Sequence, residues 1–493
     1  MSRNTAAKWY IGCDLGTSTM KGVLADATGT IIGRATRNVD LIRLDTGRVE
    51  LDAERYVQAV FGLLGQLVSQ AGQPGDVEAV CLSGASGTTL LLDDAYRPLG
   101  NAISWLDTRT AGRDQELWPD LDKASVYRRV GWPFAGTFPL AHLAWLKTFA
   151  PELWRRSRHF GLLQDYVYYR LCGRLVVDYS SATTSYLQNQ EKRAWDDALL
   201  AFIGLAPDQL SQLMPSGTVC GTLTPEALIE TGLVEGTRLV TGSFDHPSAA
   251  RSTGILNEGD LLISAGTSWV VFAPVRSREV ALNSDMLIDP FLSPSGCWGA
   301  IAALTAVAEK MNVYLDHCIA SDNGEPLFER FNRLAAASGP GAGGLFIELF
   351  SQPYETHKAM LKDAAPADVA RALMEGVVFL IRNRMDRIMR QGGQSAGRLV
   401  FTGGPTKSPV WSEILADVME RAVAIPETGE YAGAMGAVIL AGLGCRIYRD
   451  EEDGYLRTGG KARIVTPDPV RSKQYQRIYR DYVRRFNLET GDV

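Results

Sequence analysis

The sequence has few of the residues that build metal centres and disulfide frameworks. Of its 493 residues only 7 are cysteine and 5 are histidine. The cysteines are odd in number, lie far apart and include no Cys-x-x-Cys pair, and the histidines form no His-x-x-x-His set. This usage is typical of reduced thiols rather than of a disulfide scaffold or a zinc site. We therefore expect no structural metal.

Long apolar runs and an excess of basic residues are also missing. No segment reaches the ~18 uninterrupted apolar residues of a membrane span, and the polar start over residues 1–8 has no apolar signal core. Lys and Arg number 50 against 56 Asp and Glu, a formal charge of -6, whereas nucleic-acid binders carry a basic stripe. We expect a cytoplasmic protein with no membrane segment and no nucleic-acid partner.

The composition that remains is that of a globular enzyme-sized chain. Hydrophobic residues make up 46% and charged residues 22%, which excludes a disordered or fibrous protein. Glycine is the outlier, with 49 residues, or about 10% against an ordinary ~7%. Without a collagen-like period, this surplus is expected in turns and where the backbone approaches ligands closely.

A strand–turn–strand pattern occurs twice in the sequence. The first copy has an apolar strand over 9–14, a Gly-Thr-Ser turn and a second strand over 21–25. The second copy repeats this order, with strands over 260–265 and 269–273 around another Gly-Thr-Ser. The repetition predicts two lobes that begin in the same way.

Helical patterns accompany the strands in both halves of the chain. Apolar residues recur at three- and four-residue intervals over 52–71 and, in a longer amphipathic helix, over 368–390. We predict an α/β fold of two lobes of similar size that divide the chain into 1–250 and 251–493.

The first turn, between Asp14 and Lys21, has the composition of a phosphate site. Its small and hydroxyl residues leave backbone N–H groups and hydroxyls free to hold phosphate oxygens. Asp14 at the strand end is suited to a magnesium-bound water, and Lys21 offers positive charge to a transferring group. A plain β-hairpin turn explains this segment equally well on its own. The second copy, Gly266-Thr267-Ser268, strengthens the phosphate interpretation, because two such turns can hold one nucleotide's phosphate chain.

Two further loops follow predicted strands. At Gly403-Gly404 the missing side chains would let the backbone approach a flat ring or a phosphate; an ordinary strand-to-helix turn with glycines for packing is the alternative. Asp245, in a Gly-Ser loop after a strand, is placed to accept a proton from a substrate hydroxyl. Taken alone, that aspartate is more simply a cap for a helix beginning near Pro247.

Together these motifs resemble those of the FGGY carbohydrate kinases. The resemblance covers about residues 9–447 in the family's order and spacing, and rests on Ile11 to Ser18, Trp105 to Arg109, Gly242 to Asp245, Gly266 to Ser268, and Thr402 to Asp417. It implies the actin-like, ribonuclease-H-like fold of two lobes with a nucleotide cleft between them. It also implies phosphorylation of a small sugar, ketose or polyol with magnesium-ATP. Dimers are common among such kinases, so a homodimer is also expected.

The resemblance assigns roles to individual residues. It makes Asp245 the catalytic base and Asp14 the magnesium-associated carboxylate. For the nucleotide it implies two phosphate motifs and an adenosine pocket: Gly16, Thr17, Ser18 and Lys21; Gly266, Thr267 and Ser268; and Gly403, Gly404 and Ser408. Glu430 resembles the stretch that closes this pocket. For the substrate it implies Ser86, Gly87, Trp105, Asp107, Arg109 and His246.

Several of these substrate residues have a second interpretation or depart from the pattern. Asp107 and Arg109 equally suit a structural ion pair, and His246 suits either a substrate contact or packing beside the next proline. Xylulose kinases have a Met-His pair where this chain has Ser86-Gly87. Relatives also have a Gly-x-Arg-x-Pro stretch, which is absent from the corresponding residues 350–357 of this chain. These departures leave the sugar open, while the nucleotide motifs are intact.

The sequence thus predicts transfer of the γ-phosphate of ATP to a ketose such as a pentulose. A polyol or sugar acid, of the glycerol, erythritol or gluconate type, remains an alternative acceptor. A non-catalytic sugar or nucleotide sensor on the same fold is a third interpretation, against which Asp14 and Asp245 speak.

Overall fold

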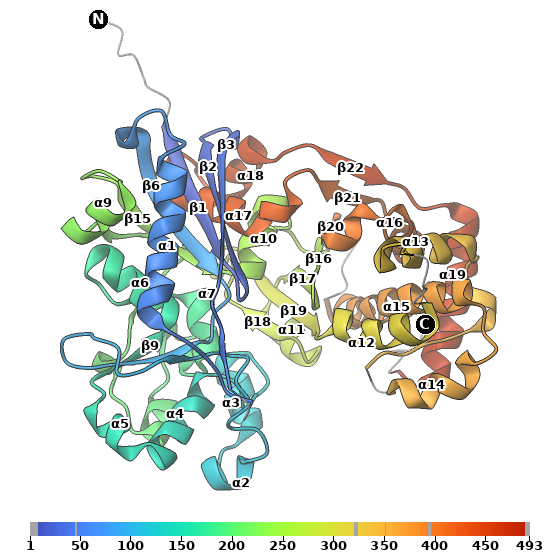
Figure 1. Cartoon of the computed structure of the whole chain (residues 1–493), viewed down its shortest axis with the longest axis horizontal. Coiled ribbons are helices and arrows are strands. Elements are labelled where there is room, and N and C mark those ends of the chain that lie inside the picture. Colours follow the sequence, from blue (N-terminus) through green and yellow to red (C-terminus); the bar gives the residue numbers. More distant parts are fainter. Residues whose placement is uncertain (1–7, 45–46, 320–323, 351, 393–395, 489–493) are drawn as a thin grey trace, which may run out of the picture. The chain divides into compact units, whose positions relative to one another are not determined.

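The computed structural model describes residues 8–44, 47–319, 324–350, 352–392 and 396–488, and these divide into two compact units (Figure 1). The first unit consists of Met1–Leu256, Asp285–Gly299 and Tyr431–Gly459, and the second of Asn257–Ser284, Ala300–Glu430 and Gly460–Val493. The first unit is the larger, and neither is one continuous stretch. This division therefore differs from the predicted halves of similar size, 1–250 and 251–493.

The first unit is built on a six-stranded sheet with the order β14-β15-β6-β1-β2-β3. β1 and β2 form the predicted hairpin, β2 pairs antiparallel with β3, and β6 runs parallel to both β1 and β15. Its strands are β1 (Trp9–Leu15), β2 (Thr19–Asp26), β3 (Ile31–Asn38), β6 (Val77–Gly84), β14 (Val219–Thr222) and β15 (Arg238–Phe244). The parallel arrangement brings the ends of β1, β6 and β15 to one edge of the sheet.

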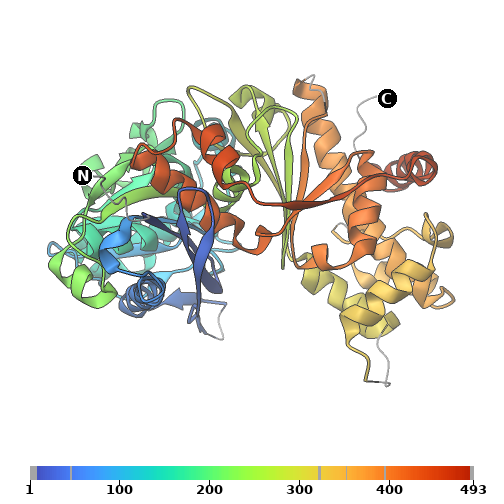
Figure 2. The ribbon, with the colours of Figure 1, turned by 90° about the horizontal axis from the view of Figure 1, so that it is seen from above.

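Helices from the two ends of the chain cover the two faces of this sheet. Helix α1 (Ala53–Val68) begins at the N-cap Asp52, and its apolar residues pack on Ile11, Cys13 and Leu15 of β1. Figure 2 shows α1 end-on against the blue strands. On the other face lies α17 (Ala432–Gly444), which is apolar on all sides and almost wholly buried. Since neighbouring strand residues point to opposite faces, Tyr10, Gly12 and Asp14 belong to the α17 face.

The rest of the first unit forms a smaller sheet and a set of helices. The sheet has the order β4-β5-β8-β7-β9, and short pairs β10-β13 and β11-β12 lie elsewhere. The strands are β4 (Ile42–Arg43), β5 (Val49–Leu51), β7 (Thr89–Leu92), β8 (Ala102–Ile103), β9 (His159–Leu162), β10 (Val176–Asp178), β11 (Gln188–Asn189), β12 (Ala194–Trp195) and β13 (Gln212–Met214). A further short strand, β18 (Leu287–Asp289), belongs to neither this sheet nor these pairs. The helices are α2 (Asp114–Leu117), α3 (Lys123–Val130), α4 (Pro139–Phe149), α5 (Pro151–Arg156), α6 (Leu163–Cys172), α7 (Tyr179–Ala182), α8 (Asp197–Ile203), α9 (Pro225–Thr231), α10 (Asp245–Thr253) and α18 (Glu451–Thr458).

Six strands of the second unit's sheet repeat the plan of the first, in the order β19-β17-β16-β20-β21-β22. β16 and β17 form the second predicted hairpin, and β16, β20 and β21 run parallel to one another. These strands are β16 (Leu261–Ala265), β17 (Trp269–Val275), β19 (Trp298–Leu304), β20 (Leu399–Gly403), β21 (Val423–Pro426) and β22 (Ala462–Val465).

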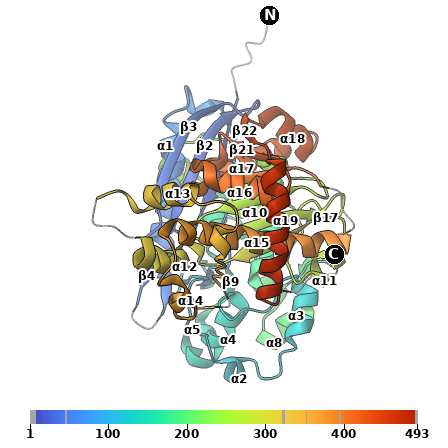
Figure 3. The same cartoon turned by 90° about the vertical axis from the view of Figure 1, so that its right-hand side faces the viewer.

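The helices of the second unit are dominated by the predicted long amphipathic helix. They are α11 (Arg278–Asn283), α12 (Val307–Tyr314), α13 (Leu327–Ala337), α14 (Tyr354–Leu361), α15 (Pro366–Gly392), α16 (Pro409–Met419) and α19 (Pro469–Arg485). Phe379 of α15 packs against Tyr475, Tyr479 and Tyr482 of α19, and Figure 3 shows the red α19 beside α15. Among the described helices, none combines the length and apolarity that crossing a membrane requires.

Candidate active site

Asp14 stands at the end of β1 with one carboxylate oxygen unpaired. Its Oδ1 is buried and has no hydrogen-bond partner among the described residues. The pKa of Asp14 is raised to about 7, first by burial and then by the charge of Asp245, while Lys21 opposes the shift. The register of the hairpin places Lys21 directly opposite Asp14. The site therefore holds a carboxylate whose charge is only partly compensated by its own protein.

The start of α17 lies against the same carboxylate. A Cβ built on Gly433 would come within 2.4 Å of Asp14 Oδ2, so only glycine leaves room there. Positive partial charge at a helix N-terminus favours an anion, and α17 supplies such an end beside Asp14. No spacing in the sequence indicates this contact, because more than 400 residues separate the two positions.

Asp245 follows β15 and is the first residue of α10, which begins two residues earlier than expected. Phe244 occupies the N-cap position, so Asp245 is not itself the cap. Its Oδ1 accepts a hydrogen bond from the backbone N–H of His246 at 2.7 Å, and about 28% of its side chain is exposed. Because Asp245 raises the pKa of Asp14, the two carboxylates share one electrostatic site. The structure thus brings together the two aspartates predicted from separate motifs.

A buried hydroxyl network, which the sequence did not indicate, fixes the strand end before Asp245. Ser83 Oγ accepts a hydrogen bond from the backbone N–H of Ser243 at 3.2 Å, and the Ser248 hydroxyl lies 3.1 Å from Ser83. On the other side, Ser180 Oγ accepts from the Phe244 N–H at 3.1 Å and donates to Asp289. Short polar side chains carry no periodic signal, so only the fold reveals them.

His246 lies beside the two aspartates. Its Nε2 is 3.7 Å from Asp245 Oδ1, and its ring packs edge-on against Phe244 at 5.4 Å between centroids. The side chain is about 23% exposed. Both predicted interpretations, a substrate contact and local packing, are compatible with this position.

Asp107 and Arg109 form a buried ion pair. Arg109 donates to both carboxylate oxygens of Asp107 at 2.9 Å, and Glu50 also accepts from Arg109 at 2.6 Å. Burial alone would raise the pKa of Asp107, but hydrogen bonds from Arg109 and from the Val49 backbone hold it below its usual range. Both oxygens of Asp107 are therefore already occupied, which favours the structural interpretation over a substrate contact.

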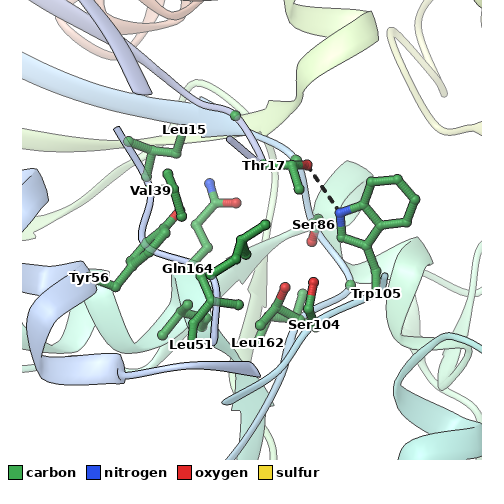
Figure 4. A pocket seen from close by; sticks show the side chains of 16 residues that line it. Leu15, Thr17, Val39, Leu51, Tyr56, Ser86, Ser104, Trp105, Leu162 and Gln164 are labelled. Carbon is green, nitrogen blue, oxygen red and sulfur yellow. Dashed lines mark hydrogen bonds between the residues drawn. The ribbon is translucent and has the colours of Figure 1, made fainter. Parts of the chain in front are cut away.

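Trp105, Ser86 and Gly87 line a common cavity with the first phosphate turn (Figure 4). Trp105 Nε1 donates to Thr17 Oγ1 at 3.1 Å, which ties the predicted substrate loop to the predicted phosphate turn. Ser86 is buried and accepts from the Thr184 hydroxyl at 3.0 Å. The cavity has a volume of about 30 Å³, room for a water molecule or one hydroxyl group rather than a whole sugar.

The predicted nucleotide residues of the second unit lie at adjoining strand ends. The register of β16 on β20 pairs Ala265 with Gly403, so the Gly266-Thr267-Ser268 turn and the two glycines follow neighbouring strands. Gly403 has a φ of +99°, and a Cβ there would lie 1.9 Å from the Ala265 carbonyl oxygen. The nearby Ser408 is buried, and its hydroxyl has no partner among the described residues, as a ligand-contacting group would. Glu430 lies in a short helical turn, Gly429–Tyr431.

The second half of the divergent segment over 350–357 lies in α14. Its His357 is buried, with Nδ1 2.8 Å from the Tyr314 hydroxyl. Ser351 lies outside the described residues.

A duplicated sheet with a Gly-Thr-Ser hairpin turn in each unit is the architecture of the actin-like ATPases, the predicted fold class. Models of the FGGY family of carbohydrate kinases match residues 9–251 with the N-terminal domain and 261–445 with the C-terminal domain. The chain therefore belongs to the FGGY family of carbohydrate kinases, which use ATP, and is a phosphotransferase with an alcohol group as acceptor.

Curated relatives match over almost their whole length. The xylulose kinase of Bacillus subtilis (strain 168) is 28% identical over 99% of this chain and 98% of its own length. The gluconokinase of Bacillus licheniformis is 24% identical over 95% of this chain and 94% of its own. The structure of xylulose kinase from Rhodospirillum rubrum superposes with a TM-score of 0.86 at 24% identity, over 97% of this chain and 98% of that one, which supports the fold.

Proposed function

We propose that this kinase transfers the γ-phosphate of ATP, bound with Mg²⁺, to a hydroxyl group of a ketose, with a pentulose as the first candidate. The observation that carries the proposal is the pair of aspartates, Asp14 and Asp245, held in one electrostatic site at the end of the first sheet. The likeness to xylulose kinases over nearly the full length supports the choice of acceptor. The Asp14 and Asp245 roles rest on this placement and on the family motifs.

Asp14 has the features of a magnesium-associated carboxylate. A buried anionic oxygen without a partner costs free energy that a bound cation or its water would recover. Mg²⁺ is often bound through one or two carboxylates and the substrate phosphates, so two aspartates suffice. When bound, Mg²⁺ would neutralise charge that develops on the phosphate oxygens.

Asp245 is proposed as the general base. Its partly exposed carboxylate accepts the proton of the acceptor hydroxyl as that oxygen forms its bond to the γ-phosphorus. The bond from the γ-phosphorus to the bridging oxygen breaks, and ADP leaves with that electron pair. The Ser83 and Ser180 hydroxyls accept hydrogen bonds from the backbone N–H groups of Ser243 and Phe244, and so fix the backbone just before the aspartate.

The two hairpin turns are proposed as the phosphate sites. Gly16, Thr17 and Ser18 in the first unit, and Gly266, Thr267 and Ser268 in the second, offer backbone N–H groups and hydroxyls to phosphate oxygens. Lys21 adds positive charge beside the first turn. We further propose that Gly403, Gly404 and Ser408 line the adenosine.

A sugar acid is the second candidate acceptor, because gluconokinases of two Bacillus species also match over about 95% of this chain.

A homodimer is proposed from the family resemblance alone, and sedimentation velocity checks it.

The direct test is ADP release from magnesium-ATP across ketoses, aldoses, polyols and sugar acids. We expect one ketose, D-xylulose or D-ribulose, to raise turnover at least tenfold above the rate without acceptor. Product mass must rise by one phosphate in the same reaction, which separates phosphorylation from stimulated ATP hydrolysis. If no compound stimulates ADP release, the proposed reaction is wrong; if only a sugar acid does, the ketose assignment is wrong.

A further inference from the structure

Gln164 lines the cavity of the first unit with a side-chain amide of which one end is hydrogen-bonded and the other is not. Gln164 is about 5% exposed, and its Nε2 donates to the Leu82 carbonyl oxygen at 3.0 Å. Its Oε1 is buried without a partner among the described residues. If the two ends of the amide were exchanged, the Gln164 oxygen would face the Leu82 carbonyl oxygen, and neither of the two can donate a hydrogen bond. The amide nitrogen therefore stays on Leu82, and the oxygen is the end left for the cavity.

The cavity joins this amide to the proposed reaction site. Gln164 shares the lining with Thr17, Ser86 and Trp105, and in the view of Figure 4 its amide end lies between Val39 and Tyr56 on one side and Thr17 and Ser86 on the other. Thr17 belongs to the phosphate turn, and Trp105 to the proposed substrate loop. An occupant of this cavity therefore lies within contact distance of both.

The remaining lining defines the chemistry of the occupant. Apart from the Tyr56 phenol, the described residues that line the cavity include no acidic or basic side chain. An unpaired amide oxygen requires a hydrogen-bond donor, whereas a carboxylate would be desolvated against that oxygen with no cation to compensate it. A neutral hydroxyl group meets both conditions and fits a volume of about 30 Å³.

We propose that Gln164 is a specificity-determining residue, whose side-chain oxygen accepts a hydrogen bond from a hydroxyl at one end of a neutral ketose or polyol. The inference rests on the proposed function, since it requires the acceptor to bind beside Trp105. It deepens that function by setting neutral acceptors apart from sugar acids. A site built to bond a hydroxyl rejects the analogue that lacks it, because its own polar group is then left unpaired.

Gln164→Met removes the acceptor while keeping a side chain of similar length. The matched control is Gln190→Met, since Gln190 is another buried glutamine whose amide donates to a main-chain carbonyl, that of Ile288 at 2.7 Å, and it does not line this cavity. Both variants are assayed with D-xylulose, its 1-, 3- and 4-deoxy analogues, xylitol and D-gluconate. Thermal melting of each variant identifies any general loss of folding.

We expect Gln164→Met to lower kcat/KM for the neutral substrate about 10- to 100-fold, mainly through KM, while Gln190→Met changes it less than threefold. One deoxy analogue should be equally poor for the wild type and for Gln164→Met. Unchanged kinetics in Gln164→Met, or the same fold loss on every analogue, would overturn the proposal and leave Gln164 with a structural or water-binding role.

Calorimetric binding of the same compounds separates this inference from the proposed function. Binding of D-xylulose without phosphorylation would refute the kinase assignment, and Gln164 would still be tested by the change in Kd. Preferred binding or phosphorylation of D-gluconate would refute the role of Gln164 and leave the kinase assignment standing. If the wild type binds none of the neutral compounds, both are wrong.

Discussion

The two units share a sheet plan but place different chemistry at the ends of their strands. In each, a hairpin is followed by two parallel strands and an outer antiparallel one. Even the close approach at the strand ends is repeated: Gly84 stands opposite Leu15 in the first unit, and Gly403 opposite Ala265 in the second. A Cβ at either glycine would lie within 2.5 Å of the facing carbonyl oxygen.

The difference lies in the carboxylates. Two residues before the Gly-Thr-Ser turn the first unit has Asp14, whereas the second has Ser264. The first residue after the second parallel strand is Asp245 in one case and the exposed Glu427 in the other. The comparison teaches that one backbone plan serves two tasks, with the proposed proton and metal chemistry on one copy and glycine and hydroxyl contacts on the other.

The largest expected effect comes from removing the proposed base at the strand ends of the first unit. Asp245→Asn should lower kcat about 10²- to 10⁴-fold, because the base is lost, while ATP binding by calorimetry stays within about threefold. The matched control, Glu427→Gln in the second unit, should keep kcat within twofold. Equal losses in the two variants, or an unchanged kcat in Asp245→Asn, would show that the acid–base chemistry is not confined to the first unit.

The next largest effect is on stability and concerns Gly403, the glycine at the close strand approach of the second unit. Gly403→Ala should destabilise the second unit by about 3 kcal/mol or more, since it combines a positive φ with a collision against Ala265. Gly404→Ala is the control, because a Cβ there meets nothing within 4 Å. Urea unfolding, with hydrogen exchange monitored separately in each unit, measures the difference in stability between the two variants. If Gly404→Ala is as damaging as Gly403→Ala, the close strand approach is not the cause.

The smallest effect concerns buried acids in the two units. Burial raises the pKa of Asp165 to about 7, and no ion pair joins it among the described residues, whereas Glu375 in the second unit pairs with Arg371 at 2.9 Å. The unfolded chain loses the Asp165 proton near pH 4 and the folded chain near pH 7, so this group's contribution to stability is lost as pH rises between them. Asp165→Asn should remove that slope and stabilise the protein at pH 8 by about 1–3 kcal/mol.

Glu375→Gln should do the opposite and destabilise at neutral pH by about 3 kcal/mol, because it leaves the Arg371 charge buried without its partner. Thermal melting of both variants from pH 4 to 8 checks the pair. A stability loss in Asp165→Asn at pH 8 would mean that its hydrogen bonds to Leu162 and Ser211 outweigh the burial of its charge.

Local signals predicted the elements that carry the motifs. The hairpins were evident from apolar runs on either side of Gly-Thr-Ser, and α1 and α15 from their helical periodicity. The structure also brings Asp14 and Asp245 into one site, as the family order suggested. These features depend on residues close in sequence, or on motifs whose order had been recognised.

Contacts between distant segments were not predictable from the sequence. The bond from Trp105 to Thr17, the serine network around Ser83 and the amide of Gln164 join residues that no spacing relates. The Asp107–Arg109 ion pair illustrates the limit, because sequence reasoning left its two interpretations balanced until the bond geometry was known.

The return of α17 to the first sheet has a consequence for how the chain is made. Tyr10 and Val23 are among the first residues synthesised, but the face they share is covered by Ala434 and Val438, which follow the bulk of the second unit. At ~5–20 residues per second, the ribosome needs roughly 10–40 s to pass from the end of α10 to the end of α17. During that interval the apolar face of the first sheet that α17 later covers is exposed to water. A chaperone would be needed most at this stage of synthesis.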